Sequence, residues 1–240
     1  MEQKIDSKKT TVFKAMVSEQ QVQDVANKKK TSLYGTVFNR PKSEEISISS
    51  IELFYEPYWI VRGNYYSEYF RKTIYDFATS PEVKEVIIGS GKFPVRTEKG
   101  KWDKIRATMK VGDNENKVEI PVEEHVELDI EDEIALNSTG TEIKFDYKID
   151  SRNVENFPEE ILKNNEMHLR PSSLNEDQVV DRLIGLLQEG NMDEGIRKIK
   201  EKITIDRLEQ IYVPVYEVKC VNSKNKVETL RVDGMNLKIL

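Results

Sequence analysis

The chain contains two segments in which a helical hydrophobic period follows a polar start signal. Ser18 and Asn175 each stand three residues before a glutamine, the capping-box arrangement that satisfies free N–H groups at a helix start. In the second segment the apolar residues fall on one helix face: Val179, Leu183, Leu186 and Leu187. The pattern predicts helices over 18–30 and 175–188. A third segment, 192–202, also has a helical pattern.

Alternation of apolar and polar residues predicts a long strand in each half of the chain. The segments 51–62 (IELFYEPYWIVR) and 208–219 (LEQIYVPVYEVK) share a Tyr-x-Pro element. Because proline has no N–H for a ladder, Pro57 and Pro214 are expected at a sheet edge or a bulge. The turn and return strand that follow each long strand are expected in 65–77 and 226–234.

The two halves match at a constant offset of 157 positions. Identical residues at this offset include Glu52 and Glu209, Tyr55 and Tyr212, Pro57 and Pro214, and Val61 and Val218. We interpret the match as an internal duplication of a unit made of a helix, a connector and an antiparallel hairpin. Two such units can pair about a pseudo-twofold axis and cover each other's edge strands. The alternative is coincidence between two strands that are rich in the same residues.

Between the halves, short strand-like segments alternate with Gly, Asn and Asp turns. They are VKEVIIGSGKFPV, DKIRATMKV, NKVEIPVEEHVELDI and TEIKFDYKI, followed by FPEEILKNN, which is typical of a short helix or a loop. Regular short strands with such turns predict a small sandwich or barrel. The expected fold class is therefore α+β, with two duplicated helix-plus-antiparallel-hairpin units (1–76 and 168–240) flanking a β-rich middle domain (77–167).

Composition limits the compartment and the partner. The 240 residues carry 37 Lys and Arg against 43 Asp and Glu, a formal net charge of −6. This charge argues against nucleic-acid binding by the whole surface, but not by a local basic patch. One cysteine excludes a disulfide framework. The charged N-terminus lacks a signal-peptide pattern and no apolar run is long enough to span a bilayer, so we expect a cytoplasmic protein without membrane contact.

Few residues could perform catalysis or bind a metal. His125 and His168 are the only histidines and Cys220 is the only thiol, so the sequence contains no zinc-site spacing. No nucleophile-elbow motif is present either. The segment IIGSGK (87–92) resembles a phosphate loop but lacks that motif's first glycine and its final Ser or Thr, which favours a hairpin turn. No cofactor is expected.

The middle region has a basic stretch and an acidic stretch. The basic stretch, 92–110, includes an aromatic residue among its cations; the central members are Lys101, Trp102, Lys104 and Arg106. Acidic residues dominate 123–133. A basic stretch with an embedded aromatic can bind phosphate and stack a base, which favours contact with RNA or another nucleic acid. The alternative is two solvated strands whose opposite charges pair across one sheet.

Aromatic residues crowd the first long strand and the segment after it. The candidates for a contact surface are Tyr58, Trp59, Tyr65, Tyr66 and Tyr69. The matching part of the second half carries Val and Lys at several of these positions, so the first half is predicted to have acquired an aromatic surface. Tyr and Trp are enriched at interfaces. The alternative interpretation is core or cross-strand packing.

The string IYVPVYEVKC followed by RVDG is similar to a hairpin in uncharacterised archaeal and bacterial proteins. In those proteins a Tyr-x-Pro strand precedes a strand that ends in Asp-Gly. The helix-plus-hairpin unit also resembles the PepSY and cystatin-like architectures. In the first half Asp76-Phe77 replaces the Asp-Gly pair. The resemblance implies no catalytic residues, and the composition, rich in Lys, Glu, Ile and Asn, resembles that of archaeal or low-GC bacterial proteins.

These patterns favour a non-enzymatic intracellular interaction or assembly protein. Its aromatic and charged β surfaces would bind a protein partner or a second copy of the chain. One alternative is a nucleoprotein- or ribosome-associated factor that contacts RNA through 92–110. Another is a metal-dependent enzyme in which Asp129 and Glu131, on one strand face, hold Mg²⁺; this spacing has little specificity.

Overall fold

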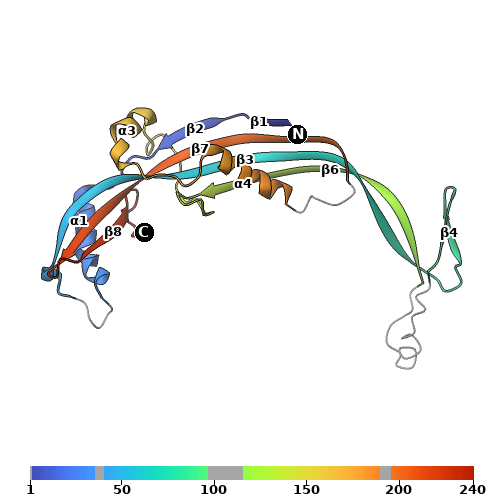
Figure 1. Cartoon of the computed structure of the whole chain (residues 1–240), viewed down its shortest axis with the longest axis horizontal. Coiled ribbons are helices and arrows are strands. Elements are labelled where there is room, and N and C mark those ends of the chain that lie inside the picture. The colour runs from blue at the N-terminus through green and yellow to red at the C-terminus, as the bar shows by residue number, and fades with distance from the viewer. Residues whose placement is uncertain (1, 36–40, 97–115, 190–195) are drawn as a thin grey trace, which may run out of the picture. The chain divides into compact units, whose positions relative to one another are not determined.

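The computed structural model describes residues 2–35, 41–96, 116–189 and 196–240 (Figure 1). The fold is mixed α and β, with strands predominating. The chain divides into two compact units, which are treated separately below. Unit 1 consists of Met1–Tyr65, Ile130–Glu189 and Lys202–Leu240, and unit 2 consists of Tyr66–Asp129 and Gly190–Glu201.

The described strands are β1 (Glu2–Ile5), β2 (Lys8–Val12), β3 (Ile46–Thr79), β4 (Glu85–Ile88), β5 (Gly91–Pro94), β6 (Asn116–Leu136), β7 (Arg197–Asn222) and β8 (Val227–Asp233). The α-helices are α1 (Glu19–Lys29), α3 (Pro158–Asn164) and α4 (Glu176–Gln188). Short 3-10 turns are η1 (Lys30–Leu33), η2 (Ser43–Glu45) and η3 (Glu166–His168). FPEEILKNN, expected to be either a short helix or a loop, contains the short helix α3.

The central pair of strands in the sheet is β3 and β7. The strand order is β1-β7-β3-β6, and both β2 and β8 also pair with β7. β1 and β2 run parallel to β7, whereas β8 runs antiparallel to it. The hydroxyl of Ser47 donates to the carbonyl of Val221, and that of Ser49 donates to the carbonyl of Lys219. The residue number increases along β3, from 47 to 49, while that of the partner on β7 decreases, from 221 to 219. The two strands are therefore antiparallel.

Both predicted helices form, and both begin with the predicted capping box. The Ser18 side chain accepts the N–H of Gln21 at the start of α1, and the glutamine side chain bonds back to the cap. Asn175 and Gln178 make the same reciprocal pair at the start of α4. Each pair satisfies two of the N–H groups that a helix start leaves free.

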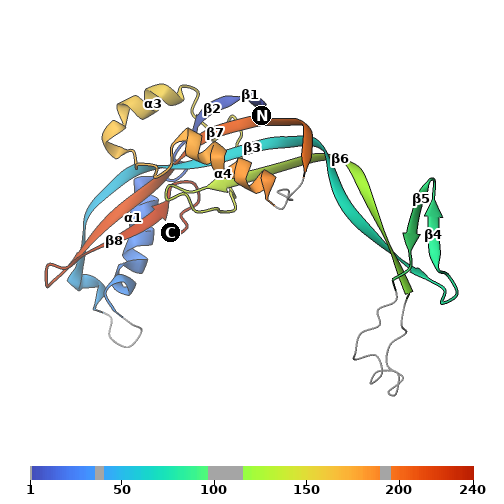
Figure 2. The same ribbon diagram turned by 45° about the vertical axis from the view of Figure 1, so that its right-hand side comes forward.

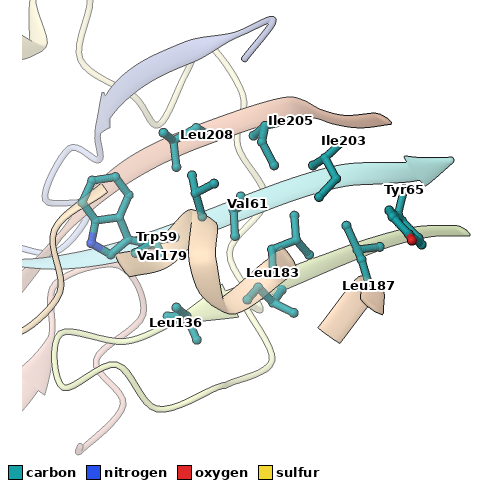
Figure 3. Close-up of a cluster of buried hydrophobic side chains, with 12 residues drawn as sticks. Trp59, Val61, Tyr65, Leu136, Val179, Leu183, Leu187, Ile203, Ile205 and Leu208 are labelled. Carbon is teal, nitrogen blue, oxygen red and sulfur yellow. The ribbon is translucent and has the colours of Figure 1, made fainter. Parts of the chain in front are cut away.

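α4 buries its apolar face against β3, β6 and β7 in unit 1 (Figure 3). The buried members of this cluster are Trp59, Val61, Tyr65, Ile134, Leu136, Val179, Val180, Leu183, Leu187, Ile203, Ile205 and Leu208. α1 forms a second cluster with β3, β7 and β8. Its buried members are Val22, Ala26, Ile46, Tyr216, Val218, Cys220, Leu230 and Val232.

The two helix clusters are built from residues that lie 157 positions apart. Matching members are Val22 and Val179, Ala26 and Leu183, Ile46 and Ile203, Tyr216 and Trp59, and Val218 and Val61. In each cluster one helix therefore covers the start of one long strand and a later part of the other. The expected pseudo-twofold axis between β3 and β7 would relate two such clusters.

Backbone contacts before each helix follow the same offset. Phe13 N donates to Tyr212 O at 2.9 Å, and Arg170 N donates to Tyr55 O at 3.0 Å. Likewise Met16 N donates to Gly234 O, and Ser173 N donates to Ser138 O, each at 2.8 Å. Gly234 follows β8 and Ser138 follows β6, so the β3–β6 pair occupies the place that the β7–β8 hairpin has in the other half.

The prediction of a turn and a return strand in 65–77 is wrong. β3 continues without a turn to Thr79, and its return strand is β6. In the second half β7 ends at Asn222 and the turn uses Asn225, whose φ is +58°. The first half has Tyr65 and Glu68 at the corresponding positions, and residues of these types do not favour a turn.

Three other expectations need correction. The segment 197–202, expected to be helical, belongs to β7, while 192–195 lies outside the described residues. TEIKFDYKI (141–149) forms only one isolated bridge, between Leu136 and Glu142. No sandwich or barrel is found in the described part of 77–167. That part contains the β4–β5 hairpin, which confirms the turn expected in IIGSGK, and the extended part of β6 (Figure 2). DKIRATMKV is not among the described residues.

The two prolines lie inside long strands, where the neighbouring strand changes. The last contact of β7 with the β2 side is made by the Tyr212 carbonyl. The Pro214 carbonyl already accepts the N–H of Gly234, at 2.9 Å, on the β8 side. A backbone N–H at position 214 would point between the β2 side and the β8 side of β7. The proline therefore costs the sheet no ladder hydrogen bond. Pro57 has the corresponding position after Tyr55.

The face of the sheet opposite the helices is covered by the strap, which we define as residues 142–154. On β3, Trp59 and Val61 face the helices, so Tyr58 and Ile60 face the other side. Ile60 joins Phe13, Ile211 and Val213 in a third buried cluster. Strap residues packed on this cluster are Phe145, Tyr147, Ile149 and Val154.

Gly63 permits close approach of β3 to β7 and α4. A methyl group there would lie 2.6 Å from the Thr204 carbonyl oxygen and 3.1 Å from Leu183 Cδ2. Gly63→Ala is therefore expected to lower the free energy of unfolding by about 1–3 kcal/mol. Gly185→Ala is the matched control, because nothing lies within 4 Å of its added methyl group and alanine favours the α4 interior by about 0.5–1 kcal/mol. Urea unfolding measures both; equal stability of Gly63→Ala and the wild type would contradict the close contact.

The strap is held by a partly buried hydrogen bond from Tyr147 Oη to Asp233 Oδ2, 2.9 Å long. Burial raises the pKa of Tyr147 far above its usual value of 10, and the Asp233 carboxylate raises it further. Because the folded pKa exceeds the unfolded one, this stabilisation is complete below pH 10 and is lost as pH rises above it. Tyr147→Phe is expected to cost about 1–3 kcal/mol near neutral pH. It should also reduce the loss of stability above pH 10, measured by urea unfolding across pH; an unchanged alkaline slope would argue against this role.

Candidate interaction surface

The aromatic part of β3 divides between two faces according to the two-residue period of a strand. Ser67 and Tyr69 of unit 2 are buried, with exposed fractions of 1% and 5%. Tyr66, Glu68 and Phe70 point to the other face and are half-buried. The aromatic density that the sequence shows is therefore split between a packing face and a solvent-facing one.

Most of the described aromatic candidates are packing residues. Trp59 and Tyr65 belong to the α4 cluster (Figure 3). The Trp59 indole N–H donates to Ser172 Oγ at 3.2 Å. Tyr69 is buried in unit 2. Tyr58 is half-buried under the strap, with its ring centroid 5.9 Å from that of Phe145. These positions agree with the alternative of core or cross-strand packing for these four residues.

Tyr66 lies on the solvent-facing side of β3, between β7 and β6. The Lys200 ammonium is 5.2 Å from the centroid of the Tyr66 ring. On the other side, Tyr66 Oη donates to Glu127 Oε1 at 3.1 Å. This hydrogen bond to a carboxylate raises the pKa of Tyr66. The three side chains form a row across the three strands.

A second row lies on Phe70 and was not predicted from the sequence. The Arg197 guanidinium is 4.5 Å from the Phe70 ring centroid, and the His125 ring stacks on Phe70 at 4.5 Å with an interplanar angle of 16°. His125 Nε2 is 2.9 Å from Glu68 Oε1. Cation–π contacts of this kind contribute about 0.5–1 kcal/mol at exposed sites. Alternation on β3 and β6 was the available signal, but the register of the two strands decides which residues meet.

The acidic stretch of β6 is paired mainly with arginines of β3 and β7. In unit 1, Arg62 pairs with Glu131, and Arg207 lies 3.6 Å from Glu133. In unit 2 the pairs are Arg71 with Glu124 at 2.6 Å, Arg96 with Glu119 at 2.7 Å and Arg197 with Glu123 at 3.7 Å. These pairs join the acidic stretch to β3 and β7, whereas the alternative interpretation predicts pairing with the basic stretch. Arg96, a described member of 92–110, pairs with Glu119, which lies outside 123–133.

The central residues of the basic stretch, Lys101, Trp102, Lys104 and Arg106, lie outside the described residues. Asp129 and Glu131 are on one face of β6, as expected for alternate residues, and Glu131 pairs with Arg62. Within the described ranges, no group of three or more His, Cys, Asp or Glu side chains is placed to hold a metal ion. No described helix combines the length and apolarity needed to cross a membrane.

Unit 2 also exposes several large apolar side chains. On β3 they are Ile74, Tyr75 and Phe77, with exposed fractions of 59%, 48% and 52%. On β4 they are Ile87 and Ile88, at 58% and 53%. By the two-residue period of a strand, Ile74 lies on the face of Tyr66 and Phe70, and Tyr75 and Phe77 lie on the opposite face. Single exposed apolar residues are common on folded proteins, whereas several on one small unit are typical of contact surfaces.

Comparison with protein-family models, with curated proteins and with solved structures found no match to this chain.

The two faces of β3 in unit 2 can be distinguished by matched substitutions. Tyr69→Ala is expected to lower the free energy of unfolding by about 3–5 kcal/mol, as for other buried aromatic residues. Tyr66→Ala removes exposed contacts with Lys200 and Glu127 and is expected to cost about 1 kcal/mol or less. Urea unfolding of the full chain gives both values. Equal costs would show that the two tyrosines do not differ in burial as the structure indicates.

Proposed function

We propose that this chain is a non-enzymatic interaction protein that binds a protein partner, or a second copy of itself, through unit 2. The exposed group Ile74, Tyr75, Phe77, Ile87 and Ile88 is the observation that carries the proposal. Exposed apolar side chains and paired charges on one unit have the composition of a protein interface, which combines an apolar centre with a polar rim. The rows on Tyr66 and Phe70 would belong to the polar rim.

We further propose that unit 1 arose by duplication of a helix-plus-hairpin unit. The matched clusters, capping boxes and backbone contacts at an offset of 157 support it. In this interpretation the extension of the β3–β6 pair is what one half gained, and the gained part carries the binding surface. The division into 1–76, 77–167 and 168–240, and the resemblance to PepSY and cystatin-like architectures, stay predictions.

The described residues give less support to the nucleic-acid alternative. Arg96, a described member of 92–110, is paired with Glu119. Positive charge available to phosphate would have to come from Lys101, Lys104 and Arg106. If the basic stretch binds RNA, reversing these three charges should weaken binding and reduce its dependence on salt.

The proposal is tested with the double variant Ile74→Ser/Phe77→Ser in the full chain. Sedimentation velocity measures self-association, and affinity purification from the source organism identifies partners. The variant is expected to lose the self-association or the partner that the wild type shows, because apolar area leaves the interface. The control Met16→Ser/Val227→Ser changes two side chains of unit 1 that are each 54% exposed, and should keep it. A wild type that stays monomeric and recovers no partner sensitive to Ile74 and Phe77 would overturn the proposal.

A further inference from the structure

Unit 1 has a cavity of about 610 Å³ beside the strap. Its walls come from the sheet, through Ile60, Ala135, Glu133 and Arg207, and from the strap over 142–149. The cavity therefore has an apolar floor and charged side chains at its borders. One long side of it is the strap itself.

The first part of the strap is an extended segment. From 142 to 149 exposed and half-buried residues alternate with a period of two, as along a strand. Phe145 and Tyr147 face the sheet and pack on its buried cluster. Lys144 and Asp146 point outward, with side chains that are 90% and 70% exposed.

The backbone of this segment lacks a partner strand. Ile143 N donates to Ala135 O at 2.9 Å, and the pairing with β6 ends there. From 144 to 149 no backbone N–H has a hydrogen-bond partner among the residues that the structure describes. The Lys148 carbonyl accepts one side-chain bond, from Asn153 Nδ2 at 2.7 Å.

The direction of these N–H groups follows from the geometry of an extended chain. Side chains occupy the inward and outward directions, so backbone polar groups point sideways, along the surface of the sheet. The cavity lies on one side of the strap. An extended chain placed there could form a ladder with the strap while its inward side chains contact Ile60 and Ala135.

We propose that the strap binds an extended polypeptide segment of a partner protein by strand addition at this cavity. The exposed charges of the strap alternate in sign: Glu142, Lys144, Asp146 and Lys148. Lys144 Nζ and Asp146 Oδ1 lie 3.3 Å apart, and this pair is largely exposed to solvent, where an ion pair contributes little and a facing strand can compete for its charges. A bound antiparallel strand is matched when its own outward charges are opposite at each facing position. A shift by two residues changes the sign of every facing pair, so the charges also select the register.

This binding site shares the general role proposed above, contact with another polypeptide, but it uses different residues. The strap lies in unit 1 and includes none of the apolar residues of unit 2. Either proposal can therefore fail while the other holds. The Ile74→Ser/Phe77→Ser variant is expected to bind a strap ligand as the wild type does.

A defined peptide serves as the probe. A peptide with the sequence of residues 141–149, TEIKFDYKI, is complementary to the strap in an antiparallel register centred on Phe145. In that register Glu142 of the strap faces the peptide lysine that corresponds to Lys148. Lys144 of the strap faces the peptide aspartate that corresponds to Asp146. The control peptide exchanges the acidic and basic residues among these positions, so that like charges face each other while the composition changes little.

The experiment measures both peptides against the full chain by titration calorimetry. The complementary peptide is expected to bind at least tenfold more tightly than the control. In the variant Glu142→Lys/Lys144→Glu/Asp146→Lys/Lys148→Glu all four changed side chains are exposed, so folding is preserved, and the preference should reverse. In an extended peptide, alternate backbone nitrogens form two sets that point to opposite sides, and these sets are the two possible phases of N-methylation. Methylation of the set that faces the strap should abolish binding, because it blocks the ladder.

The inference is overturned if neither peptide binds at millimolar concentration, if both bind equally well, or if the preference persists in the charge-exchanged variant. Binding that tolerates N-methylation in both phases would indicate a charge contact without strand addition, which also contradicts it. Circular dichroism of the variant confirms that it is folded before these outcomes are read.

Discussion

The burial of the face shared by β3 and β7 beneath α1 and α4 is the interaction on which unit 1 depends. Helices of 11 and 13 residues are marginal alone in water, so each needs a sheet surface to cover. Neither long strand provides that surface by itself. β7 gives Ile203 to the α4 cluster and Val218 to the α1 cluster, at opposite ends of one strand. Each half is therefore completed by the other, and the two must form together.

The opposite face of the sheet shows where the matched halves differ. Ile60 and Val213 lie under the strap, whereas the residues at the corresponding positions are Glu217 and Glu56. Those two acids pair with Arg170 and Arg231 and remain within reach of solvent. One half of this face is thus an apolar support for the strap, and the other is a solvated surface of ion pairs. Under the proposed duplication, the strap and the extended β3–β6 pair are parts of one half without a counterpart in the other, and both proposed binding surfaces lie on them.

The helices follow from local signals along the chain, whereas non-local geometry determines the rest of the fold. Both capping boxes were visible because each depends on residues three apart, such as Asn175 and Gln178. The continuation of β3 past Tyr65 could have been predicted from the lack of turn residues where Asn222 and Asn225 end the other strand. The row on Phe70 could not, because it depends on the register between strands that are distant in the chain. The segment 197–202 has a helical pattern, but pairing within the sheet overrides that preference.

The acidic residues of β6 are already paired within the sheet, so they would add little affinity to the binding proposed for unit 2. Surface ion pairs contribute little net free energy, and their charges are already compensated within the sheet. A partner would gain little by displacing Arg197 from Glu123, since it would have to restore the lost contact. Apolar side chains such as Ile74 and Phe77 have no such competing partner in the part of the chain described here, and covering them releases water from each one. If unit 2 binds a partner as proposed, its affinity would depend on apolar area, and the charged rows would mainly determine which partners and orientations are tolerated.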